Sequence, residues 1–257
     1  MPKVEAERRE RITVLTINRP EVHHCIDVET AALLEEAIVE FGEDEESDVL
    51  VVTGSGPEAF SSGADLKAAE GLLEREGWNR SGPLGFARLD PGKPTIAAVN
   101  GYCFAGGLEL ACWCDIRIAS ENAEFGVLNR RWGVPLVDGG TQRLPRIVGQ
   151  GNAMYLALTG VRIDARRALA MGLVQEVVPS GQALTRALEL AEAVASYPQA
   201  SLKADRRGLL VALGLPMADG LEEEAEAGIA TVADPEMAAG LARFADGDRP
   251  EPPQPAG

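Results

Sequence analysis

Two stretches of this sequence follow one plan, in which an apolar strand runs into a loop of small residues that opens a helix. In residues 48–67, "DVLVVTGS" precedes "GPEAFSSGADLK", and in residues 95–110, "TIAAV" precedes "NGYCFAGGLEL". Glycine lets the backbone adopt unusual angles and lets a ligand approach closely. The N–H groups at a helix N-terminus attract developing negative charge. Two such loops aimed at one point would form an oxyanion hole; otherwise they are tight strand–helix turns.

The rest of the chain alternates β-rich and helical segments in the same way. Strands are expected at 11–20, 48–55, 95–102, 115–120 and 172–179, with an amphipathic helix over 28–44. A strand–helix–strand unit favours a right-handed parallel crossover. From about residue 141 helical patterns dominate. We therefore predict an α/β core over 1–195, a helical region over 196–250 and a disordered tail over 251–257.

Composition excludes several classes of partner and site. The net charge of −16 over 257 residues argues against nucleic acid or an anionic membrane surface as the main partner. Four cysteines and an N-terminus without an apolar signal segment favour the reducing cytoplasm. The apolar stretch 95–114 carries polar residues and is not expected to span a membrane. Both histidines, His23 and His24, lack a metal partner at ligand spacing, so no metal and no cofactor is expected.

Glu109 stands alone among apolar residues in "GGLELACWC". A carboxylate in such a setting faces water, pairs with a cation or has a function that offsets the cost of its burial. One interpretation is a glutamate favoured at a helix start by the helix dipole. The other is a general acid/base whose pKa is adjusted by burial.

"FSSGADLK", followed by "KPTIAAVNGYCFAGGLELACWCDIRIAS", "AEFGV" and "GGTQRLPRIVG", resembles the crotonase superfamily, the enoyl-CoA hydratase/isomerase family. The resemblance covers roughly residues 10–200. It implies a spiral of ββα units with a helical C-terminal trimerisation region, hence a homotrimer or a dimer of trimers. It also implies an acyl-CoA thioester substrate, of which coenzyme A is a part. The activity it favours is enoyl-CoA hydration; a crotonase-type isomerase, lyase, hydrolase or decarboxylase and a non-catalytic acyl-CoA binder remain alternatives.

The resemblance also assigns residues to roles. It places the two oxyanion N–H donors on Ala64 and Gly106, and the first catalytic glutamate on Glu109. The residues it implies in coenzyme A binding are Arg19, His24, Ser62, Gly63, Ala64, Asp65, Leu66, Lys67 and Gly106. Arg19 and Lys67 are the candidates for phosphate or ribose contacts, with ordinary surface charge as the alternative.

The chain departs from the family at the second catalytic glutamate, whose position is taken by Asn129, twenty residues after Glu109. An amide can orient a water molecule but cannot deliver a proton. Asp138, ahead of a glycine pair, is either a loop carboxylate near a helix dipole or a relocated acid/base facing Glu109. One of Arg130 and Arg131 is expected to pair with Asp138 or Glu109.

Overall fold

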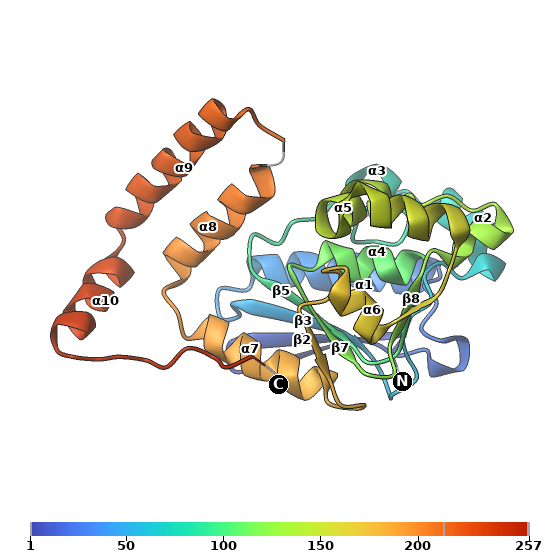
Figure 1. The fold of residues 1–257 in the computed structure, drawn as a ribbon, viewed down its shortest axis with the longest axis horizontal. Coiled ribbons are helices and arrows are strands. Elements are labelled where there is room, and N and C mark those ends of the chain that lie inside the picture. The colour runs from blue at the N-terminus through green and yellow to red at the C-terminus, as the bar shows by residue number, and fades with distance from the viewer. Residues whose placement is uncertain (1, 213, 256–257) are drawn as a thin grey trace.

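The computed structural model describes residues 2–212 and 214–255. Its main sheet lies at the centre of the molecule (Figure 1). In spatial order the strands of that sheet are β1 (Val4–Arg9), β2 (Ile12–Ile17), β3 (Val49–Gly54), β5 (Thr95–Val99), β7 (Ile116–Ser120) and β10 (Glu176–Val178). β1 runs antiparallel to β2, and every later neighbour is parallel. The parallel α/β core expected from the alternating pattern is confirmed.

Both faces of this sheet are covered. Side chains alternate in direction along a strand, so one strand serves two cores. In β3, Val49 and Val51 pack with the small residues of α7 (Ala183–Ala195). Leu50 and Val52 belong to the larger core that includes α1 (Val28–Glu43) and α4 (Gly106–Trp113). β3 is therefore buried on both faces, as its continuous apolar run favours.

A second, smaller sheet packs beside the first. In spatial order it contains β4 (Ala59–Ser61), β6 (Tyr102–Phe104), β8 (Glu124–Gly126) and β9 (Ile163–Asp164). The prediction of one strand over 95–102 is wrong, because the chain leaves the main sheet after Val99 and enters this one at Tyr102. The Asn100 side chain makes the corner: its Nδ2 donates to the carbonyl oxygens of Gly54 at 3.0 Å and Ala59 at 2.8 Å. It thereby ties the β5–β6 corner to the β3–β4 corner.

Helices complete the fold. The shorter elements are the 3-10 turns Pro20–Val22, Leu66–Ala68 and Leu128–Trp132, and the helices α2 (Ala69–Leu73), α3 (Trp78–Ser81) and α6 (Ala165–Ala170). α5 (Gly140–Thr159) packs over α4 and is kinked at Gly149. α8 (Gln199–Val211), α9 (Met217–Val232) and α10 (Pro235–Ala245) extend away from the body (Figure 1). Among the described residues, no helix has the length and apolar character to cross a membrane.

Candidate functional site

The two small-residue loops converge. They meet where Gly63, after β4, contacts Gly106, the first residue of α4. A Cβ atom added to Gly106 would lie 3.1 Å from Gly63 Cα and 3.5 Å from the amide nitrogen of Ala64. Gly63 has a φ of +83°, which a larger residue would adopt only with strain. The loops are therefore more than separate turns, since their backbones are in contact.

This contact brings the amides of Ala64 and Gly106 close together. Gly106 is the first helical residue of α4, so its N–H has no acceptor within the helix. Over residues 2–212 and 214–255, neither amide donates a hydrogen bond to another protein group. The preceding residue, Ala105, has a φ of 51° and is held by its own N–H, which donates to the Gly126 carbonyl at 2.9 Å. Such backbone strain gathers at functional sites.

Glu109 lies in the first turn of α4 and is 4% exposed. Its Oε1 accepts hydrogen bonds from the backbone N–H groups of Asp138, at 2.9 Å, and Gly140, at 2.7 Å. Burial, reinforced by the nearby Asp138 charge, raises the pKa of Glu109 to about 8, although these two N–H groups and Arg143 oppose the rise. The carboxyl group thus carries a proton near neutral pH and is fixed by backbone groups.

Asp138 is the second buried carboxyl group at this place, at 2% exposure. Its Oδ1 accepts a hydrogen bond from the Leu84 N–H at 3.1 Å. Burial raises the pKa of Asp138 to about 6, against the lowering effects of that N–H and of three nearby arginines, Arg88, Arg75 and Arg143. α5 begins two residues later, at Gly140, so Asp138 lies in the turn before the helix. Its charge raises the pKa of Glu109, so the two carboxyl groups influence one another.

The expectation that Arg130 or Arg131 pairs with these carboxyl groups is wrong. Both side chains are exposed, and Arg130 donates its Nε hydrogen to the Ala157 carbonyl at 3.2 Å. Arg143, in the first turn of α5, is instead the arginine whose charge acts on both carboxyl groups, although its own hydrogen bonds go to backbone carbonyl groups. Its Nη2 donates to the Ala87 carbonyl at 2.7 Å and its Nη1 to the Asp138 carbonyl at 3.4 Å.

Asn129 is buried, and its side chain forms a hydrogen bond within its own loop. Its Nδ2 donates to the Val134 carbonyl at 2.8 Å, and the Val134 N–H donates back to the Asn129 carbonyl at 3.3 Å. Both bonds close the turn that follows Leu128–Trp132. The Nδ2 group is therefore occupied in holding the loop, whereas Oδ1 accepts no hydrogen bond from the residues that the structure describes.

Arg19 and His24 hold the loop expected to bind coenzyme A. The Arg19 guanidinium donates to the Cys25 carbonyl and to Asp65 at 3.1 Å. His24 is buried; its Nδ1 accepts from the Arg19 N–H at 3.0 Å and its Nε2 donates to the Ser55 carbonyl at 2.9 Å. Burial lowers the pKa of His24, so the neutral ring that these two bonds require is favoured.

The stretch 62–67 is more open. The backbone N–H of Ser62 donates to the His23 carbonyl at 3.0 Å, and Asp65 caps the following turn through the Lys67 N–H at 3.1 Å. The side chains of Leu66 and Lys67 are exposed. Lys67 is thus an accessible cation three residues from Ala64.

Sequence reasoning missed two contributors to this site. Arg143 could be anticipated only by placing it on the inward face of α5, one turn after Gly139. The Leu84 N–H, which binds Asp138, carries no sequence signal at all because it is a backbone group 54 residues away.

The family profile described as enoyl-CoA hydratase/isomerase matches residues 7–251. A short-chain-enoyl-CoA hydratase of Clostridium acetobutylicum is 38% identical over 207 residues, 79% of each chain. A crotonyl-CoA hydratase of Syntrophomonas wolfei is 36% identical over 200 residues, 77% of each chain. The crystal structure of an enoyl-CoA hydratase from Mycobacterium tuberculosis H37Rv superposes with a TM-score of 0.91 at 33% identity, covering 98% of both chains. The chain therefore belongs to the enoyl-CoA hydratase/isomerase family.

Proposed function

We propose that this protein adds water to the double bond of a 2-enoyl-CoA thioester, as a hydratase of the lyase class. The observation that carries the proposal is that two buried carboxyl groups, Glu109 and Asp138, accompany the paired amides of Ala64 and Gly106. Relatives named as enoyl-CoA and crotonyl-CoA hydratases support the same substrate class.

In this mechanism the thioester oxygen accepts hydrogen bonds from the N–H groups of Ala64 and Gly106. When water attacks the β-carbon, electron density moves through the α-carbon to that oxygen and forms an enolate. Preorganised donors stabilise the new charge, and loss of one such donor typically lowers the rate by about 10²–10³-fold. The dipole of α4 adds to the effect, since its N-terminus points at the same oxygen.

The two carboxyl groups divide the proton transfers. Asp138, with a pKa of about 6, is ionised at pH 7, whereas Glu109, with a pKa of about 8, is protonated. Groups whose pKa values are pushed apart in this way suit acid and base roles. Asp138 takes a proton from the attacking water as the hydroxyl group bonds to the β-carbon, and Glu109 gives its proton to the α-carbon. Transfer between the pair then restores the starting state.

The test follows the loss of conjugated thioester absorbance of crotonyl-CoA, using wild type and Glu109→Gln. The variant keeps the acceptor oxygen for the Asp138 and Gly140 amides but cannot transfer a proton. We expect its rate to fall by about 10²-fold or more with nearly unchanged affinity for the thioester. The exposed Glu121→Gln is the matched control and keeps the wild-type rate.

Two outcomes would contradict the proposal. Equal rates for wild type and Glu109→Gln remove Glu109 from the mechanism. Binding of crotonyl-CoA by the wild type without loss of absorbance excludes hydration. Proton exchange at the α-carbon of a saturated acyl-CoA in heavy water then separates another enolate reaction from binding alone, because only a catalyst with a working base exchanges that proton.

We also propose that Lys67 contacts a phosphate of coenzyme A, because it is exposed and close in the chain to Ala64. Arg19 would act indirectly, since its guanidinium holds the binding loop through Asp65. We expect Lys67→Ala to raise KM with little change in kcat. Such a result would show that Lys67 binds the substrate and the transition state equally, because its loss weakens binding without slowing the chemical step.

A homo-oligomer, either a trimer or a dimer of trimers, is part of the proposal. Helices α8–α10 carry many exposed apolar side chains on an extension that projects from the body (Figure 1). The most exposed are Leu209, Met217, Ile229, Val232 and Phe244. Such a surface is typical of a protein–protein contact. Sedimentation velocity should give the mass of three or six chains; a monomer would contradict this part. A cytoplasmic location remains a prediction.

A further inference from the structure

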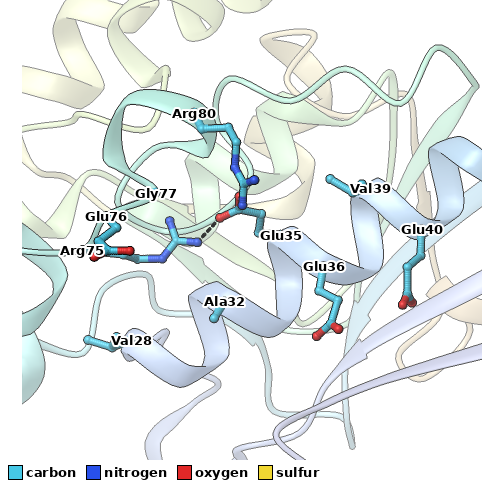
Figure 2. Close-up of a pocket in the computed structure, with 10 residues that line it drawn as sticks. All are labelled: Val28, Ala32, Glu35, Glu36, Val39, Glu40, Arg75, Glu76, Gly77 and Arg80. Carbon is cyan, nitrogen blue, oxygen red and sulfur yellow. Dashed lines mark hydrogen bonds and ion pairs between the residues drawn. The ribbon is translucent and has the colours of Figure 1, made fainter.

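A buried charged pair joins α1 to the segment before β5, beside the site. Glu35, on that helix, is 4% exposed, and its carboxylate pairs with Arg75, whose side chain is 7% exposed. Figure 2 shows the Arg75 guanidinium directed at the Glu35 carboxylate, with Arg80 approaching from the opposite side. The Ser81 hydroxyl also donates to Glu35, at 2.7 Å. Burying such charges is costly unless hydrogen bonds and opposite charges offset it. Here Arg75 and Ser81 donate to Glu35 Oε2, and Oε1 is paired with Arg80.

Arg75 also binds the segment 81–85, so it connects Glu35 to that segment. Its Nη1 donates to the Ser81 hydroxyl at 3.0 Å and to the Gly82 carbonyl at 2.8 Å. The other end of the segment is seated on α1, since a Cβ atom on Gly85 would lie 2.8 Å from the Ala31 carbonyl carbon. α1, through Glu35 and Ala31, therefore determines where these five residues lie.

The same segment forms one wall of the site. The Leu84 N–H donates to Asp138, and the Leu84 side chain packs against Gly106. Gly82 faces the same carboxylate: a Cβ atom there would lie 2.8 Å from Asp138 Oδ1. A continuous set of contacts thus joins Glu35 to Arg75, Arg75 to segment 81–85, and that segment to Asp138.

We propose that Glu35 and Arg75 are positioning residues for the site, which set the place of the Leu84 amide and, through it, the orientation and ionisation of Asp138. This inference rests on the proposed role of Asp138 in hydration. Neither residue contacts the substrate in this scheme. Their effect passes through a backbone segment clamped at both ends, and a misplacement of about 1 Å at a site can cost about 10²-fold in rate.

The first experiment needs no substrate. It follows the carboxyl ¹³C shift of Asp138 during a pH titration of protein labelled at aspartate, assigned by comparison with Asp138→Asn. The charges that face Asp138 are Glu109 from α4, Arg143 from α5, and Arg75 and Arg88 from the segment before β5. Arg75→Gln removes one of these cations and loosens the Leu84 donor, so the midpoint should rise by about 0.5 pH unit or more. An unchanged midpoint would overturn the inference.

The second experiment is a double-mutant cycle on crotonyl-CoA hydration. Arg75→Gln should lower kcat by roughly tenfold or more in the wild-type background, with a smaller loss for Arg75→Lys, which keeps the charge but not the two-pronged geometry. In the Asp138→Asn background the same change should cost less than about twofold, because the group it positions is gone. Equal losses in both backgrounds would refute a role through Asp138.

A matched control separates positioning from general stability. Arg186 is also a largely buried arginine paired with a carboxylate, Glu176, at 2.7 Å between α7 and β10. Arg186→Gln should leave kcat and the Asp138 titration as in wild type; a loss equal to that of Arg75→Gln would mean that any broken ion pair has this effect. A wild type without hydration activity would refute the proposed function, whereas the titration would still decide the positioning role.

Discussion

Replacing Glu109 by Gln should stabilise the protein at alkaline pH. The folded protein raises the pKa of this carboxyl group from an ordinary value of 4.5 to about 8, chiefly by burial. Between those values the folded state holds a proton that the unfolded chain has lost. Wild-type stability should therefore fall with rising pH, by about 1.4 kcal/mol per unit for this one group. Across the whole interval the loss approaches about 5 kcal/mol.

Glutamine keeps the shape of the protonated glutamic acid and the oxygen that accepts from the Asp138 and Gly140 amides. Urea unfolding of both proteins at fixed concentration should give similar stabilities at pH 5. By pH 8.5 the variant should be more stable than the wild type by several kcal/mol, because only the wild type loses free energy of unfolding as Glu109 gives up its proton. The exposed Glu121→Gln should follow the wild type at both pH values. Parallel pH dependences for wild type and Glu109→Gln would show that Glu109 is not held protonated, and the acid role would fail with it.

Three further predictions concern the pH dependence of the rate and the residues Gly63 and Asn129. Wild-type kcat/KM should be bell-shaped in pH with limbs near the pKa values of about 6 and about 8, and Asp138→Asn should remove the lower limb; a limb that persists would belong to another group. Gly63→Ala should lower the hydration rate by about 10²-fold while the protein stays folded by circular dichroism, because the new Cβ atom would lie 2.9 Å from Gly106 Cα. Asn129→Asp should lower stability in urea by roughly 1–3 kcal/mol without raising the rate, because a carboxylate would face the Val134 carbonyl; a faster enzyme would contradict the structural role of Asn129.

The local features of the site could be predicted from the sequence. Small-residue loops after apolar strands, and a lone carboxylate in an apolar helix, carry their physical reasons within a few residues. Glu109 is accordingly buried in the first turn of α4, and the loops around Ala64 and Gly106 converge. The placement of Glu109 depends on short-range backbone geometry, which a single sequence window contains, whereas the convergence of the two loops is a long-range contact that the sequence left open.

The rest depends on contacts between distant segments. At the corner where the chain enters the second sheet, Asn100 binds carbonyl groups more than 40 residues away, a contact that no periodicity reveals. The arginine beside the carboxyl pair is Arg143 rather than Arg130, because the turn before α5 determines which side chain points inward. The sequence leaves two roles open for Asp138, because the group that binds its carboxylate is the backbone N–H of Leu84, which has no sequence signal.

The hydrogen bonds that hold Glu109 also determine how the site moves. Its Oε1 accepts hydrogen bonds from the N–H groups of residues 138 and 140, so the turn that carries Asp138 also holds the Glu109 side chain. When this turn fluctuates, the two carboxyl groups are displaced together and their separation is preserved. The amide of Gly106 moves with Glu109, because both lie in the first turn of α4, whereas the amide of Ala64 belongs to another loop, so its distance from the carboxyl pair is the one left to vary. Thermal motion in this protein should therefore disturb the reach of the acid–base pair to the thioester before it disturbs proton exchange within the pair.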